Sequence, residues 1–279
     1  MTERELITRS YDDGAQREYG RLLQSPLQEA EWELTVELID EYVPEGSAVV
    51  DIGAGPGRYS EHLLKRRGCE VGLVDLSGSC LALFNSRVGE ADRGRVRFTW
   101  ESCATDLSWI PGEQFDAALL MGPLYHLLEE GERRRAIAEA RRVLKPDGIA
   151  VASFISRYPV FSRILTHDPS LLHDQTFLED LFERGLVRAQ HGITSMTDHF
   201  RCWPQEAKAL MEAGGFETLR MRNLEGVGAF FQARQEKVLA EQRDKRAWFE
   251  LLRRTCELPD LLGATLHFLY VGRKNRGDA

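Results

Sequence analysis

Short apolar runs alternate with charged, amphipathic segments along most of the chain. The apolar runs are bounded by glycine, proline or acidic residues, which is typical of β-strands. The segments between most of them repeat apolar residues at helical spacing. We expect strands at residues 48–52, 71–75, 96–100, 114–121, 149–155, 216–224 and 265–273. Strands that alternate with helices favour the α/β class, a largely parallel sheet with helices on its faces.

Three stretches interrupt this alternation and carry helical spacing of their own. Residues 16–42 repeat apolar positions on recurring faces, and Pro26 divides them into two helices. We therefore divide the chain into a helical N-terminal lid (1–45), a core (46–155), a helical cap insertion (156–195), a core helix and strand (196–228), a second helical insertion (229–263) and a last strand with a tail (264–279).

A glycine-rich turn joins the first two expected strands. Residues 48–77 read AVVDIGAGPGRYSEHLLKRRGCEVGLVDLS, a strand, a turn, a helix and a second strand. Glycines permit tight backbone geometry and let a ligand approach without a Cβ in the way. Both strands close on a carboxylate, Asp51 and Asp75. Since ligands bind at the carboxyl ends of parallel strands, we expect the main site there.

The spacing of the glycines separates two interpretations of this turn. A nicotinamide-binding turn has the pattern Gly-x-Gly-x-x-Gly, and counting from Gly53 its third glycine position holds Arg58. The glycines instead lie at 53, 55 and 57. The stretch Val50-Asp51-Ile52-Gly53-Ala54-Gly55-Pro56-Gly57 resembles motif I of the class I S-adenosylmethionine (SAM) dependent methyltransferases. Later stretches resemble the same family, Phe115-Asp116 before an apolar run and Leu144-Lys145-Pro146-Asp147-Gly148.

The resemblance implies a fold and a cofactor. The fold would be a Rossmann-like sheet of seven strands in the order 3-2-1-4-5-7-6, with strand 7 antiparallel, and the cofactor would be SAM, released as S-adenosylhomocysteine. Asp75 matches the family acid that takes both ribose hydroxyls. The cofactor-binding residues implied are Asp51, Gly53, Ala54, Gly55 and Gly57 of the turn, Asp75, Leu76 and Ser77 after the second strand, Met121 at the end of the fourth, and Tyr11, Tyr19 and Arg21 of the lid.

The adenine contact departs from the family pattern. Where members usually show Gly-Asp-Ala, this chain has Ser102-Cys103-Ala104. Either Cys103 occupies that place while the backbone of Ala104 reads the base, or Asp106 takes over.

Candidate catalytic residues follow the fourth strand and the cap. His126 is our first choice for a general base, because its ordinary pKa of about 6.5 suits proton removal at neutral pH. Tyr125 would orient the acceptor, and His199 is a second candidate base. Each also has a structural interpretation, since one member of a neighbouring pair commonly packs inward and lone histidines are often structural. We expect no metal.

The composition limits the classes of partner that we expect the protein to bind. The 279 residues carry a net charge of −8, which argues against a broad nucleic-acid-binding face. Five scattered cysteines and no apolar signal or membrane segment suggest a reduced, cytoplasmic protein. The N-terminal lid and the cap are similar to those of bacterial small-molecule (natural-product) methyltransferases. This resemblance implies a small acceptor that is methylated on O, N or an aromatic carbon, such as the C3 of an indole. We expect the protein to be a monomer or homodimer. The alternatives are an NAD(P)-dependent oxidoreductase, a non-catalytic SAM-binding regulator and, least favoured, an RNA methyltransferase.

Overall fold

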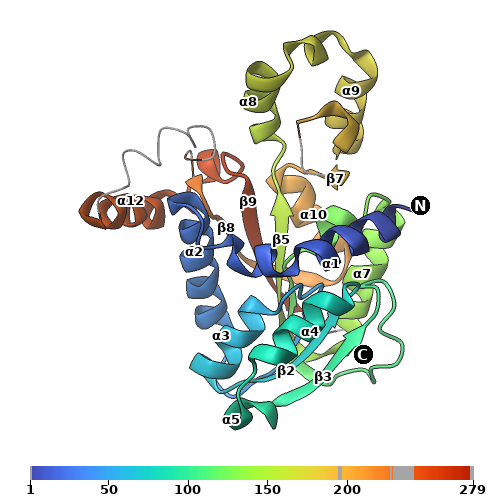
Figure 1. Cartoon of the computed structure of the whole chain (residues 1–279), viewed down its shortest axis with the longest axis vertical. Helices are drawn as coiled ribbons and strands as arrows, with labels where there is room; N and C mark the ends of the chain where they lie inside the picture. The colour runs from blue at the N-terminus through green and yellow to red at the C-terminus, as the bar shows by residue number, and fades with distance from the viewer. Residues whose placement is uncertain (1, 194–196, 227, 229–241, 277–279) are drawn as a thin grey trace.

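A computed structural model describes residues 2–193, 197–226, 228 and 242–276, and it shows a seven-stranded sheet between two layers of helices (Figure 1). The strand order is β3-β2-β1-β4-β5-β9-β8, and β9 runs antiparallel to both of its neighbours. The order predicted from the family resemblance is confirmed. The strands are β1 (Ala48–Ile52), β2 (Glu70–Asp75), β3 (Val96–Glu101), β4 (Phe115–Leu120), β5 (Leu144–Ile155), β8 (Phe216–Asn223) and β9 (His267–Lys274).

Each face of the sheet has its own apolar core. Successive strand residues point to opposite faces, so Val49 joins one core and Val50 the other. The first face packs against α2 (Pro26–Tyr42), α3 (Arg58–Arg67), α4 (Gly78–Arg87) and α12 (Gln242–Thr255). The second packs against α7 (Glu130–Val143) and α10 (Pro204–Ala213). Burial on both faces explains why the central strands read as continuous apolar runs.

Helix α1 (Glu3–Arg21) lies across the end of the sheet (Figure 1). It starts well before the helix we placed at residue 16, because Thr2 and Glu5 form a capping box at its N-terminus. The start escaped sequence analysis because α1 buries little apolar surface, and its buried residues are only Ile7, Gly14 and Ala15. Ser25 then caps α2, and Pro26 is the first residue of that helix.

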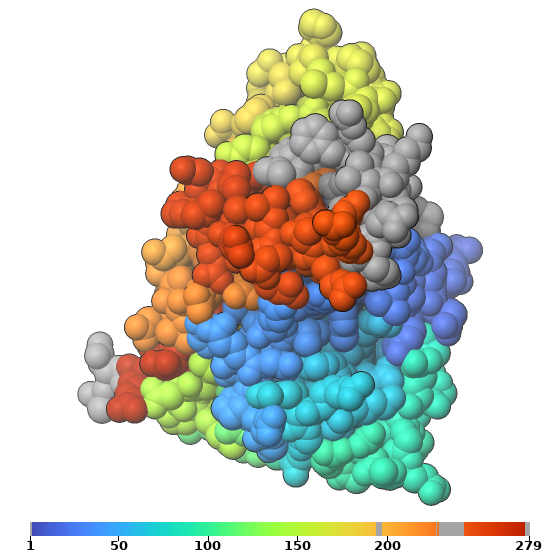
Figure 2. All heavy atoms as spheres, turned by 90° about the vertical axis from the view of Figure 1, so that its left-hand side faces the viewer, coloured from blue at the N-terminus to red at the C-terminus, as the bar shows by residue number. Residues whose placement is uncertain are grey.

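The segment between β5 and α10 stands above the sheet, as Figures 1 and 2 show. It folds around an apolar cluster of its own, with Val160, Leu171 and Phe177 among its members. Its elements are α8 (Tyr158–His167), η1 (Pro169–His173), α9 (Gln175–Glu179), η2 (Asp180–Arg184), β6 (Leu186–Val187), η3 (Ala189–His191) and β7 (His199–Phe200). We did not expect the β6–β7 pair, because two-residue strands leave no periodic signal.

Several predicted boundaries need correction. Strand β5 begins at Leu144 rather than at residue 149, and the expected turn is a local irregularity within it, with Asp147 at φ 62°. Short elements complete the fold, α5 (Glu90–Arg93), α6 (Pro123–His126) and η5 (Pro259–Leu261). Of the expected helical segment 229–263, residues 229–241 lie outside the described ranges, as do 194–196. Within the described ranges, every helix is too short or too polar to span a lipid bilayer.

Candidate functional site

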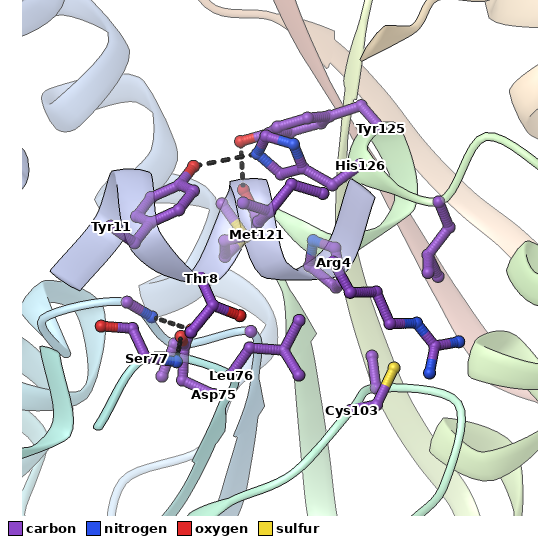
Figure 3. Close-up of a pocket in the computed structure, with 18 of the residues that line it drawn as sticks. Arg4, Thr8, Tyr11, Asp75, Leu76, Ser77, Cys103, Met121, Tyr125 and His126 are labelled. Carbon is purple, nitrogen blue, oxygen red and sulfur yellow. Dashed lines mark hydrogen bonds between the residues drawn. The ribbon is translucent and has the colours of Figure 1, made fainter. Parts of the chain in front are cut away.

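A cavity of about 600 Å³ lies between α1 and the carboxyl ends of β1, β2, β3 and β4. Figure 3 shows its walls, with Asp75 and Ser77 on one side, Cys103 and Arg4 on another, and Tyr11 facing His126. The predicted site residues that line it are Tyr11, Arg21, Gly53, Ala54, Gly55, Asp75, Leu76, Ser77, Cys103, Ala104, Met121, Tyr125 and His126. Segments far apart in the sequence therefore meet around one space.

The glycine turn and Asp75 form one hydrogen-bonded unit at the floor of the cavity. The Asp75 carboxylate accepts hydrogen bonds from the backbone N–H of Gly55 at 2.6 Å and of Ser77 at 2.8 Å. Burial raises the pKa of Asp75, although these N–H groups lower it. Gly53 has φ 72°, and a Cβ there would lie 2.8 Å from the ring of Pro123. The turn therefore requires glycine at this position.

Helix α1 roofs the cavity and is fastened at several points. The Tyr11 hydroxyl and Nε2 of His126 are 2.9 Å apart. Asp12 accepts hydrogen bonds from the Ser77 hydroxyl at 2.5 Å and from the backbone N–H of Ser79 at 3.1 Å. An acid at the N-terminus of α4 is also favoured by the helix dipole. These contacts hold α1 over the cavity.

His126 is buried and has one unsatisfied nitrogen. Its Nδ1 atom has no hydrogen-bond partner among the described residues. Burial lowers the pKa of His126 to about 4, so the imidazole is neutral at pH 7 and is a weaker base than a solvent-exposed histidine. Tyr125 also lines the cavity and donates to the carbonyl of Met121 at 3.3 Å. Both members of the pair line the cavity, because α6 is a single short turn, and our expectation that only one of them takes part in the chemistry stays a prediction.

Some predicted residues lie away from the cavity. The Tyr19 hydroxyl donates to Glu61 at 2.7 Å, and the guanidinium of Arg87 lies 3.8 Å over its ring. Asp51 is buried beneath the turn, where it accepts a hydrogen bond from Ser60 at 2.7 Å. Burial raises the pKa of Asp51 to about 7. Neither Tyr19 nor Asp51 is among the described residues that line the cavity.

Gly57, Asp106 and His199 also lie off the cavity wall. Gly57 begins α3 with φ 69°, where a Cβ would lie 2.4 Å from the ring of Phe84. Asp106 is exposed and accepts from a nearby backbone N–H at 3.1 Å. His199 stands behind His126, with 5.1 Å between their ring centroids. His199 is thus near the site without lining it.

Arg21 belongs to a buried cluster beside the cavity. Its guanidinium donates two hydrogen bonds to Glu31, at 2.8 and 2.9 Å, and a third to Glu18. Nδ1 of His267 lies 2.8 Å from Glu225 and 3.6 Å from Glu31. Burial alone would lower the pKa of His267. The negative charges of Glu31 and Glu225 outweigh the effect of burial, so the pKa is raised. We call Arg21, Glu31, Glu225 and His267 the balanced cluster.

The balanced cluster also contains the one group of potential metal ligands found among the described residues. Glu31, Glu225 and His267 each offer one atom, and these atoms lie within 4.8 Å of one another. Each of the three already faces an oppositely charged side chain, so ion pairing alone accounts for the cluster.

Sequence analysis missed several residues of the cavity wall. Arg4, Thr8 and Glu18 come from α1, whose start we placed too late, and Arg188 comes from the segment after β6. Arg4 pairs with Glu132 at 2.5 Å. A capping box at Thr2 was the signal that would have found the start of α1.

A stretch of the chain matches a known family of proteins. Residues 49–148 match the family model described as a methyltransferase domain. A protein of Encephalitozoon cuniculi that is named a methyltransferase is 31% identical over 146 residues, which are 52% of this chain and 60% of that relative. The chain thus matches less than two thirds of that relative's length.

Two solved structures share the fold at low identity. The 1,6-didemethyltoxoflavin-N1-methyltransferase of Burkholderia thailandensis, solved with 1,6-didemethyltoxoflavin and S-adenosylhomocysteine, has a TM-score of 0.57 and 17% identity, with 99% of this chain and 91% of that chain covered. The cyclase SpnF has a TM-score of 0.53 and 21% identity, with 88% and 81% covered. At this identity the likeness establishes the fold alone.

Proposed function

We propose that the chain, whose residues 49–148 match a methyltransferase domain, is a class I SAM-dependent methyltransferase that transfers a methyl group from SAM to a small acceptor. The observation that carries this proposal is the cavity shared by the glycine turn, Asp75 and the Tyr125–His126 pair. Its roof, α1, leaves little room for a polymer beside His126, which favours a small molecule. The methylated heterocycle named for the Burkholderia enzyme is an acceptor of this size class.

The residues on the cavity wall suit the parts of the cofactor. We infer that Asp75 binds the ribose hydroxyls and that the turn at Gly53 and Gly55 approaches the methionine part. For adenine we favour Cys103 and Ala104 over Asp106, since only the first two line the cavity. Arg21 lines it too, but its hydrogen bonds to Glu31 compete with any role as a carboxylate ligand.

When bound, SAM supplies a methyl group that is already activated for displacement. The protein's tasks are then to align the acceptor and to remove a proton. Alignment of reacting atoms is worth on the order of 7–11 kcal/mol. We assign proton removal to Nδ1 of His126, which is buried, neutral and without a hydrogen-bond partner in the part of the chain that the structure describes, while Tyr11 holds the opposite ring nitrogen. Tyr125 orients the acceptor.

Transfer of label from methyl-labelled SAM into an extract of the producing organism tests this function. We expect label in the low-molecular-mass fraction. His126→Gln should lower turnover about 100-fold or more, with SAM affinity unchanged. Label in protein or RNA only would reject the small acceptor, and an equal loss of binding and turnover would make His126 structural.

A second candidate is a SAM-binding protein that does not transfer the methyl group. The likeness to a cyclase favours it, since a fold does not dictate a reaction. It predicts tight SAM binding without label in any fraction.

Cytoplasmic location, a monomeric or homodimeric state and a role in secondary metabolism belong to the main proposal.

A further inference from the structure

The two sides of the extended segment at β7 face different parts of the protein. Phe200 and Cys202 face the main core. Since side chains of an extended strand alternate, His199 and Arg201 face the opposite side, toward α6 and the cap. The His199 ring lies 5.1 Å from the ring of His126 and 6.1 Å from that of Tyr125. Arg201 therefore lies on the side of β7 that adjoins the catalytic candidates.

Arg201 carries a buried charge that the described part of the chain does not neutralise. It is 3% exposed, and its Nε atom has no hydrogen-bond partner among the residues that the structure describes. One Nη1 bond reaches the carbonyl of Ser156 at 3.2 Å. Arg163 of α8 donates to the carbonyl of Ile193 at 2.8 Å. Within the described residues, neither guanidinium has a carboxylate at ion-pair distance, and the charge that acts most on Arg201 is that of Arg163.

A neighbouring arginine shows the usual arrangement. Arg157 is 2% exposed, and it pairs with Glu206 at 3.0 Å while donating to two backbone carbonyls. Burial of an unpaired charge costs several kcal/mol, so buried charges normally have partners. Burial and the charge of Arg163 lower the pKa of Arg201 to about 9, so it still carries its charge at pH 7. Arg163, His199 and Arg201 lie behind the cavity wall and not on it, and a ligand group of negative charge that reached them would complete this side of β7.

We propose that Arg201 and Arg163, beside His199, bind a carboxylate of the acceptor, so that the substrates are small organic acids. We call these three residues the cationic face. This inference rests on the proposed function and names its substrate class. A guanidinium matches a carboxylate with paired N–H groups.

The distances also limit the acceptor's shape. Extended chain advances about 3.3 Å per residue, so the Cα atoms of His199 and Arg201 are roughly 6–7 Å apart, and the His199 ring lies 5.1 Å from the His126 ring. An acceptor that reaches both places holds its nucleophilic atom several bonds away from its carboxylate. Phenolic and indolic acids have this form, whereas an α-amino acid methylated on its amine does not.

Binding of acids and their neutral amides tests the proposal directly. The probes are 4-hydroxyphenylacetate and indole-3-acetate, their amides, and phenyl phosphate, each titrated into the full chain with S-adenosylhomocysteine present. We expect at least one acid to bind about 10- to 100-fold more tightly than its amide, as for a hydrogen bond to a charged group. Arg201→Met should abolish this ratio, and Arg201→Lys should restore part of it.

Arg133→Met is the matched control, because Arg133 is equally buried but packs on Phe200 at the opposite side of β7. It should keep the ratio, which does not depend on the fraction of folded protein. If no acid binds more tightly than its amide, or if Arg201→Met keeps the preference, the proposal is wrong. A preference for phenyl phosphate over both acids would also overturn it. If S-adenosylhomocysteine itself fails to bind, the proposed function fails first.

Discussion

Two buried polar clusters flank Tyr125, and they differ in charge. The ring of Tyr125 lies 6.3 Å from His267 of the balanced cluster and 6.1 Å from His199 of the cationic face. In the balanced cluster, two carboxylates face Arg21 and His267, and they raise the pKa of His267. In the cationic face, the described residues supply two guanidiniums and no acid.

The difference in charge indicates that the balanced cluster stabilises the fold, whereas the cationic face is suited to bind a ligand. The balanced cluster joins α1, α2 and the start of β9, and its ion pairs need nothing from outside. The cationic face keeps a desolvation cost that no carboxylate among the described residues offsets. Substitutions in the two clusters should therefore have unequal effects on stability, even though both clusters are buried.

The largest effect should follow from breaking the balanced cluster. Glu225 accepts hydrogen bonds from the backbone N–H groups of Leu266 and His267, and it pairs with the His267 ring. Glu225→Gln removes the nearer of the two carboxylates that face the buried His267 ring and weakens the acceptor of two backbone N–H groups, so the free energy of unfolding should fall by about 3–5 kcal/mol. Urea denaturation measures this. The exposed Glu217→Gln on β8 is the control, and a loss below about 1 kcal/mol at Glu225 would contradict the interpretation.

An intermediate effect should appear in the pH dependence of stability. Burial lowers the pKa of His126 to about 4, below its unfolded value of about 6.5. As pH falls from about 6.5 toward 4, the unfolded chain gains a proton that the folded chain does not, so stability falls. At pH 5 this costs the wild type about 2 kcal/mol that His126→Gln avoids. Urea denaturation at pH 7 and pH 5 measures the difference, and parallel losses in both proteins would refute a neutral buried His126.

His267 should respond in the opposite direction. Its carboxylate partners raise its pKa, so its contribution to stability is complete below the unfolded pKa and is lost as pH rises through the folded value. The same denaturation series, extended above pH 7, should show wild-type stability declining more than that of His267→Gln.

The smallest change in stability should come from the cationic face. Arg201→Met removes an unpaired charge and one hydrogen bond, so the free energy of unfolding should change by no more than about 1 kcal/mol, or increase. Arg157→Met removes a paired charge nearby and should cost about 1.5–3 kcal/mol. If Arg201→Met destabilises the protein as much as Arg157→Met does, Arg201 has a structural partner and the contrast fails.

Sequence patterns predicted the sheet well for a physical reason. Strands such as β1 are apolar throughout and end at glycine or an acid, so local sequence and tertiary burial agree. The glycine turn and Asp75 were found in the same way. The start of α1 was missed because a helix that roofs a polar cavity has little apolar periodicity.

The two buried polar clusters could not be predicted from the sequence. Arg21, Glu31 and His267 meet only through tertiary packing, and no spacing connects them. We chose His199 as a candidate base because its segment was expected to return to the cleft between cap and core, whereas burial and neighbouring positive charges lower its pKa to about 2. Arg201 gave no signal, because an unpaired buried charge is visible only in three dimensions.

Titration with S-adenosylhomocysteine tests the central claim, that the cavity between the glycine turn and α1 binds the cofactor, most directly. Asp75 lines that cavity and Asp106 does not. We predict that Asp75→Asn lowers affinity by about 1.5–3 kcal/mol, whereas Asp106→Asn, matched in chemistry, leaves it unchanged. Equal affinity of the wild type and Asp75→Asn would contradict the account.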